Sequence, residues 1–133
     1  MEYQPPFFKD FVVDISGNPS NGHSESFHLP FGMVPVAISA PSNIQGSSRA
    51  TFMVADDDAA DDTGFEHIYG EDNVLDHIVL GTSRTLDVPA TIRRGCLGRS
   101  FVRLVLMNGS NVAGEPNDDV TYRVYFADAR GAS

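Results

Sequence analysis

The segment Val-Thr-Tyr-Arg-Val-Tyr-Phe at residues 120–126 places an apolar side chain at every second position, from Val120 to Phe126. Successive side chains of a β-strand point to opposite faces of its sheet. A period of two therefore predicts a strand that is buried on one face and exposed on the other. This half-buried pattern is typical of antiparallel sheets, because strands of parallel sheets are usually apolar on both faces.

Runs with strand character fill most of the chain before this segment. They are separated by turn-forming Gly, Asn, Asp and Pro residues, and they lie at residues 34–39, 50–55, 65–69, 74–80, 85–88 and 101–107. Short strands with such punctuation predict an all-β fold, an antiparallel β-sandwich or jelly-roll-like domain of about eight strands. Only residues 89–97 have the character of a short helix.

Two of these runs carry a more specific expectation. Pro35 cannot donate a ladder hydrogen bond, so its run is predicted to lie at a sheet edge or to start a strand near that residue. The run Phe-Val-Arg-Leu-Val-Leu-Met at residues 101–107 has the character of a strand buried on both faces, with Arg103 as the exception.

Residues 1–26 differ from the rest of the chain and are predicted to form an N-terminal arm followed by an edge strand. Four aromatic residues crowd around the prolines of this segment: Tyr3, Phe7, Phe8 and Phe11. We expect an extended arm, a strand over residues 8–15 and a long polar turn, because Pro5 and Pro6 stiffen the chain and oppose a helix. Such an arm can pack on its own domain or on a neighbour. Residues 27–133 are then predicted to be a single β-sandwich domain.

The composition narrows the classes of function. With 133 residues, 41% of them hydrophobic and 20% charged, the chain has the size and composition of one folded domain. Its net charge of −9 disfavours nucleic acid and anionic membrane surfaces as partners. No segment is apolar enough to span a bilayer, and the N-terminus lacks the pattern of a secretory signal. A soluble protein made in the cytoplasm is therefore expected.

Few side chains suggest catalytic or metal chemistry. The single cysteine, Cys96, excludes an internal disulfide and a multi-cysteine metal site, and we interpret it as a small buried thiol. His67 and His77 could meet across a hairpin, although a partly exposed sheet histidine is the commoner outcome. The chain contains no nucleophile elbow, phosphate-binding loop or dinucleotide motif. No catalytic residue, metal or cofactor is therefore predicted, and a non-enzymatic function is expected.

The densest polar feature is the acidic segment at residues 56–62, which holds five Asp carboxylates. Calcium binds six to eight oxygen ligands, so this segment could form a calcium site. The spacing does not match the twelve-residue calcium loop, because the glycine and the glutamate of that loop are missing. A solvated acidic loop between two strands is the favoured interpretation.

Charge is distributed unevenly along the chain. Residues 50–80 carry nine acidic residues and no basic residue, whereas residues 81–105 carry five arginines and a single acid. The arginines could simply offset the acidic loops within one molecule. Alternatively, the two kinds of surface could pair between subunits, or the arginines could bind an acidic partner. Arg93, Arg94 and Arg99 are the candidates for such a contact, since the planar guanidinium suits protein interfaces.

The order of several motifs resembles a group of small β-sandwich proteins from tailed bacteriophages, whose genes are often found among virion genes near the capsid protein. The resemblance covers residues 38–127 and consists of core and turn residues. Its first motifs are a strand with an acidic turn at residues 52–57 and a Gly-Phe…Ile-Tyr strand at 64–69. Ser83-Arg84 and the Leu-x-Val-Pro segment at 86–89 follow. The last motifs are Gly98 before the strand at 99–104, a polar turn at 108–110, and the final strand at 119–124. The acidic turn is longer than in the pattern, and the N-terminal arm lies outside it.

This resemblance implies a virion surface protein that decorates or cements the outer surface of the capsid. The implied partner is the major capsid protein, and a homotrimer is expected because decoration proteins often sit on threefold axes. The aromatic arm residues Tyr3, Phe7, Phe8 and Phe11 would anchor the contact, and the three arginines would form its polar rim. The alternative is a receptor- or carbohydrate-binding module on a phage tail or head fibre, in which Tyr69, Tyr122 and Tyr125 could stack on sugars.

Overall fold

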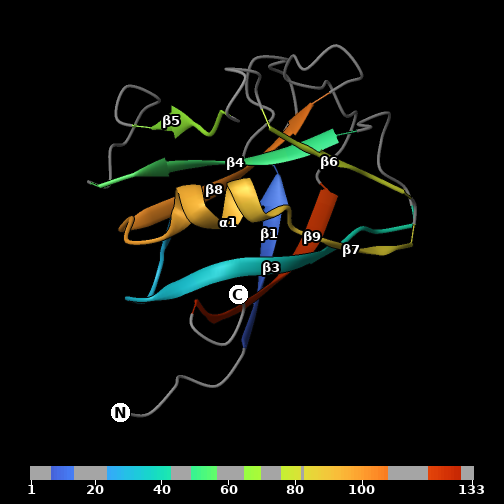
Figure 1. The fold of residues 1–133 in the computed structure, drawn as a ribbon. Helices are drawn as coiled ribbons and strands as arrows, with labels where there is room; N and C mark the ends of the chain where they lie inside the picture. The colour runs from blue at the N-terminus through green and yellow to red at the C-terminus, as the bar shows by residue number, and fades with distance from the viewer. Residues whose placement is uncertain are drawn as a thin grey trace.

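The computed structural model describes residues 7–13, 24–42, 49–56, 65–69, 76–81, 83–107 and 120–129. Within these residues the chain forms two antiparallel sheets that pack face to face, with one short helix between them (Figure 1). The elements are β1 (Phe7–Val13), β2 (Phe27–His28), β3 (Met33–Ser39), β4 (Arg49–Ala55), β5 (Glu66–His67), β6 (Ile78–Val79), β7 (Thr85–Asp87), α1 (Ala90–Cys96), β8 (Phe101–Met107) and β9 (Val120–Asp128). The prediction of an all-β antiparallel sandwich is confirmed.

The first sheet has the strand order β1-β9-β3-β7, and the second has the order β2-β8-β4-β5, with β6 also paired to β4. Strand β9 runs along both of its neighbours in the first sheet. Its residues alternate between buried and exposed from Val120 to Phe126, as the period-two pattern predicts. Strands β4 and β8 pair over seven residues at the centre of the second sheet and are buried on both faces over most of their length.

The main core lies between the two sheets. Its largest fully buried side chains include Tyr122, Phe126 and Ile38 from the first sheet, and Phe52 and Leu104 from the second. The hydroxyl group of Tyr122 has no hydrogen-bond partner among the described residues, and burial raises the pKa of this phenol to about 12. Packing of apolar side chains between two twisted sheets is therefore the main source of stability in this fold.

Four phenylalanine rings connect the two sheets at the side where β1 and β2 lie. Phe126 stacks on Phe7 at 5.2 Å between ring centroids and lies 5.5 Å from Phe27. Phe11 meets Phe27 edge-on at 5.9 Å. Because Phe27 belongs to the second sheet and the other three rings belong to the first, this aromatic cluster joins the neighbouring edges of the two sheets.

The short helix α1 closes the opposite side of the sandwich. It contacts β3 of the first sheet and β4 of the second, and Figure 1 shows it between them. Ile92 and Cys96 are its buried residues. The prediction of a helical turn or two at residues 89–97 agrees with this helix. Among the described residues, no helix is long and apolar enough to cross a membrane.

A second, smaller core lies on the outer face of the second sheet, where Met53, Phe65, Val105 and Met107 are buried. Arg103 was expected to be the exception to burial in its strand, and this expectation is wrong, because Arg103 is only 5% exposed. Its guanidinium lies 4.2 Å from the ring centroid of Phe65, and its Nη2 atom lies 3.5 Å from the sulfur of Met53. Stacking on an aromatic ring lets the weakly hydrated guanidinium enter an apolar environment.

Pro35 occupies a position that its missing N–H group explains. Strand β3 lies inside the first sheet, between β9 and β7, so the prediction of an edge strand is wrong for the strand as a whole. Pro35 nevertheless lies near the start of β3, and the described pairing with β7 begins only at Ala37. The register with β9 also shifts between Pro35 and Ala37, as at a β-bulge, which is a usual location for proline in a sheet.

Gly95 in α1 offers a test of how closely the helix packs on the sandwich. A Cβ atom at this position would lie 2.7 Å from Cγ2 of Ile68. We expect Gly95→Ala to destabilise the fold by about 1–3 kcal/mol through overpacking, although alanine is the better helix former. Urea denaturation measures the change. The substitution Gly95→Ala should become nearly harmless in an Ile68→Ala background, and an equal loss in both backgrounds would contradict the proposed contact.

Candidate protein-binding face

The outer face of the first sheet carries a row of exposed side chains. On β1, Phe8, Asp10 and Val12 alternate with the inward-facing residues, and on β9 Arg123 and Tyr125 do the same. Phe8 is 46% exposed and Tyr125 is 37% exposed. We refer to these five residues as the outer patch.

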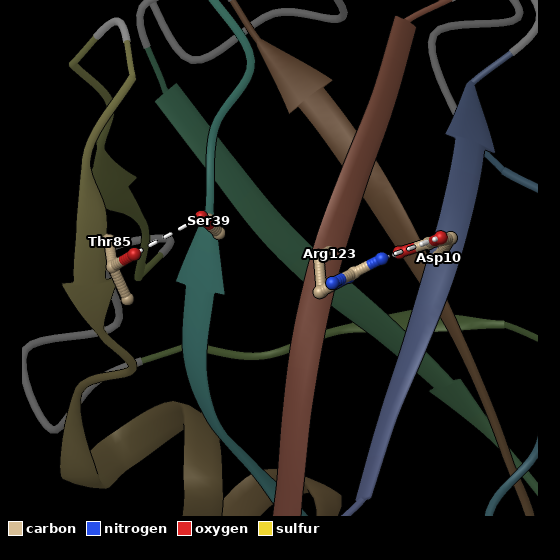
Figure 2. A network of polar contacts seen from close by, with 4 residues as sticks. All are labelled: Asp10, Ser39, Thr85 and Arg123. Carbon is tan, nitrogen blue, oxygen red and sulfur yellow. Dashed lines mark hydrogen bonds and ion pairs between the residues drawn. The ribbon is translucent and has the colours of Figure 1, made fainter.

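The outer patch is organised around Arg123. Asp10 and Arg123 are directly opposite in the register of β1 and β9. The Nε and Nη2 atoms of Arg123 donate hydrogen bonds to the two carboxylate oxygens of Asp10 at 2.9 and 3.3 Å, and Figure 2 shows this pair reaching across the two strands. The guanidinium also lies 3.9 Å from the ring centroid of Phe8. Arg123 is thus held by a carboxylate and by an aromatic face together.

These contacts settle the charge state of the outer patch. The hydrogen bond from Arg123 lowers the pKa of Asp10, and the same bond, with a smaller contribution from Tyr125, raises the pKa of Arg123. The Asp10 carboxylate and the Arg123 guanidinium therefore both stay charged around neutral pH, and their opposite charges cancel. The chain as a whole has a net charge of −9, so the outer patch is a locally neutral area on an acidic protein.

The same sheet face continues to β3 and β7. There the hydroxyl groups of Ser39 and Thr85 are hydrogen-bonded at 3.1 Å, on strands that pair directly (Figure 2). Phe8 and Tyr125 meet edge-to-face, with 6.3 Å between their ring centroids. The face therefore combines aromatic rings with polar groups that already satisfy one another. Interfaces are enriched in Phe, Tyr and Arg, and this arrangement is suited to binding another protein surface.

The structure separates the aromatic residues that the sequence grouped together. Phe8 is exposed in the outer patch, whereas Phe7 is half-buried and Phe11 is only 2% exposed. Phe7 and Phe11 belong to the aromatic cluster between the sheets, so the expectation that Phe11 is a surface anchor is not met in this fold. Tyr3 lies outside the described residues. Of the strand predicted at residues 8–15, the structure describes β1 as Phe7–Val13, and residues 14 and 15 lie outside the described residues. Strand β1 lies at an edge of the first sheet and contributes side chains to the same core as the rest of the sandwich.

The three candidate arginines lie away from the outer patch, on or near α1. Arg94 is exposed, and Arg93 is half-buried and donates a hydrogen bond to the carbonyl of Val88. Since α1 contacts β3 and β4, while β1 lies at the far edge of the first sheet, the aromatic residues of β1 and these arginines do not form one continuous surface.

Arg99 has partners within its own chain. Its Nε lies 2.9 Å from a carboxylate oxygen of Asp56, and its Nη2 lies 3.6 Å from Glu66. For this residue the interpretation that arginines offset the acidic segment within one molecule agrees with the structure. Of the acidic segment itself, only Asp56 is described, and residues 57–62 lie outside the described residues. Among the described residues, no group of three or more His, Cys, Asp or Glu could hold a metal ion.

Two further candidate groups are placed by the structure. His67 on β5 and His77 beside β6 do not face each other across a hairpin, because β5 and β6 each pair with β4 instead. Cys96 is fully buried, and burial raises the pKa of its thiol to about 12, which confirms its interpretation as a buried thiol.

Sequence reasoning missed Asp10, Val12, Arg123 and Tyr125 as members of one surface. The alternation at residues 120–126 places Arg123 and Tyr125 on the exposed side, so part of the signal was present. The missing information was the partner strand, because β1 and β9 are separated by more than a hundred residues. Comparisons of the chain with protein-family models, with curated proteins and with solved structures found no match.

The environment of His67 predicts a pH-dependent stability. Burial lowers its pKa below the ordinary value of 6.5, and the positive charge of Arg103 lowers it further. Its Nδ1 atom is buried and has no hydrogen-bond partner among the described residues. Above about pH 6.5 the imidazole is neutral in both the folded and the unfolded chain. Below that pH the unfolded chain takes up a proton more readily than the folded one, so folding stability falls as the pH decreases.

Urea denaturation between pH 7.5 and 5 measures this effect. We expect the midpoint to decrease on acidification in the wild type, and to decrease less in His67→Gln. His28→Gln serves as the control, since His28 is an exposed histidine on β2. Equal pH dependence in the wild type and in His67→Gln would show that another group is responsible.

Proposed function

We propose that this chain is a non-enzymatic virion structural protein, which decorates and cements the outer surface of a phage capsid by binding major capsid protein subunits through the outer patch. The family resemblance of residues 38–127 supports the viral role. The observation that supports binding through this face is the exposed pair of rings, Phe8 and Tyr125, arranged around Arg123. The protein would be made in the host bacterial cytoplasm and incorporated into the virion.

The mechanism would be adhesion without any covalent step. Contact with a capsid subunit would remove water from Phe8, Val12 and Tyr125, which supplies the favourable free energy. Burial of an unpaired charge would oppose binding, but Arg123 already has its carboxylate partner in the free protein. The rings and the guanidinium also restrain each other, so little conformational entropy is lost on binding.

The first test is co-sedimentation of the purified chain with capsids that lack it. We expect the double variant Phe8→Ala/Tyr125→Ala to bind at least about tenfold more weakly, because truncation of central aromatic anchors typically costs more than about 1 kcal/mol each. Tyr69→Ala is the matched control, since Tyr69 is also an exposed aromatic but follows β5 of the second sheet. Unchanged binding of the double variant would rule out the outer patch as the contact.

The Asp10–Arg123 pair provides a second test of the same interface. Asp10→Ala leaves the arginine without its carboxylate at the moment when the patch is buried, so binding should weaken strongly. The double variant Asp10→Ala/Arg123→Leu removes the charge as well and should recover part of the lost affinity. Additive losses measured by the same sedimentation assay would mean that the pair is not buried against the partner.

A further inference from the structure

Strand β5 and the residue before it, Phe65, cover part of the smaller core on the outer face of the second sheet. In the described ladder, β5 pairs with β4 through Glu66 and His67. Phe65 and His67 are two residues apart and therefore lie on the same face of the strand. The ring of Phe65 is buried against the guanidinium of Arg103, with 4.2 Å to the ring centroid. A cover held by so short a ladder at a sheet edge can open without the rest of the sandwich.

The residue after β5 is anchored in a different core. Ile68 is buried in the main core between the two sheets. Its side chain lies close to Gly95 of α1, and its carbonyl accepts a hydrogen bond from the amide of Asp76 at 3.1 Å. An opening movement of Phe65 and β5 can therefore end at Ile68 and leave the main core and α1 in place.

The side chain of His67 is poorly placed to carry a positive charge in this closed arrangement. Its Nδ1 atom is buried and has no hydrogen-bond partner among the described residues. Protonation turns both ring nitrogens into donors, so the N–H group at Nδ1 would be buried without an acceptor. Burial lowers the pKa of His67, and the positive charge of Arg103 lowers it further, in agreement with this geometry.

The described charged groups on the neighbouring strands do not compensate a proton on this imidazole. Arg103 faces it from β8, and Arg49 lies at the far end of β4 on the same sheet face. Glu66, the other residue of β5, points to the opposite face by alternation and forms an ion pair with Arg99 at 3.6 Å. Asp56, directly after β4, binds the same arginine at 2.9 Å. Both of these carboxylates are therefore already engaged by Arg99.

We propose that Phe65 and β5 form an acid-sensitive flap, which opens when His67 is protonated and exposes Met53 of the smaller core while the main core stays folded. In the open form the imidazole is solvated and lies away from Arg103, so it binds a proton with its ordinary affinity. Protons therefore favour the open form over the closed one, and opening increases as the pH falls below about 6.5. The flap lies on the second sheet, so this inference is independent of the outer patch on the first sheet.

Oxidation of the purified full chain by hydrogen peroxide, followed by peptide mass spectrometry, measures the opening. A thioether does not titrate in this pH range, so its rate of sulfoxide formation reports access to the sulfur. Met53 belongs to the smaller core beside the flap, whereas Met33 is buried in the main core and is the internal control. Between pH 7.5 and 5.5 we expect the oxidation of Met53 to accelerate about three- to tenfold, since an imidazole with an ordinary pKa contributes at most about tenfold one pH unit below that value.

The rate of Met33 should stay constant over the same range. Equal acceleration of Met33 and Met53 would show global unfolding, and an unchanged rate at Met53 would show that the flap stays closed. Either result would overturn the proposal.

Two variants identify the group that titrates. His67→Gln keeps a polar side chain that does not titrate, so the acid acceleration at Met53 should be lost, whereas His28→Gln on the exposed strand β2 should retain it. If His67→Gln already raises the oxidation of Met53 at pH 7.5, Arg103→Met is the second variant. It removes the charge that opposes protonation and should reduce the acceleration. Full acceleration in both variants would assign the opening to another group and overturn the proposal, and co-sedimentation with capsids at pH 7.5 would still report on the outer patch separately.

Discussion

Strand β9 is hydrogen-bonded along both of its edges, to β1 on one side and to β3 on the other, and it buries alternate side chains in the core. A shift of its register by one residue would expose Tyr122 and bury Arg123, because the side-chain period of a strand is two. The free energy of burying Tyr122, Val124 and Phe126 therefore decides which residues appear on the outer face. Arg123 and Tyr125 are exposed because the residues that alternate with them are buried in the core.

The fold class followed from local patterns in the sequence, whereas the surfaces did not. Alternation at residues 120–126 and the apolar run at 101–107 identified β9 and β8, and the weak helical character of residues 89–97 agrees with α1. The pairing of β1 with β9 could not be predicted, since no local pattern indicates a partner so distant in sequence. Without that pairing, Phe8 could not be separated from Phe11, and Asp10 could not be matched with Arg123. Arg103 was misjudged for a related reason, since its burial depends on Phe65, which precedes β5 and is distant in sequence.

The two sides of the sandwich are closed by different means. Helix α1 covers the side at β3 and β4, where Gly95 allows close approach to Ile68. At the opposite side, phenylalanine rings join β1 to β2 without a covering element among the described residues. A groove between the two sheet edges remains there, and the ammonium group of Lys9 lies beside its aromatic surface. The rings at this edge mainly serve stability, because Phe11 and Phe126 are almost completely buried.

The pairing of the first strand with the last one also has a consequence for synthesis. Asp10 and Arg123 are 113 residues apart in the chain, so β1 emerges from the ribosome long before its partner is made. Until β9 follows, β1 can be paired with neither its strand partner nor the rings of Phe126, and contacts between such distant segments form slowly. During that interval the apolar residues of β1 are not yet buried, and exposed apolar surface and unpaired strand edges favour aggregation. The outer patch itself forms only after β9 has been made, because Arg123 and Tyr125 come from β9 and pair with residues of β1.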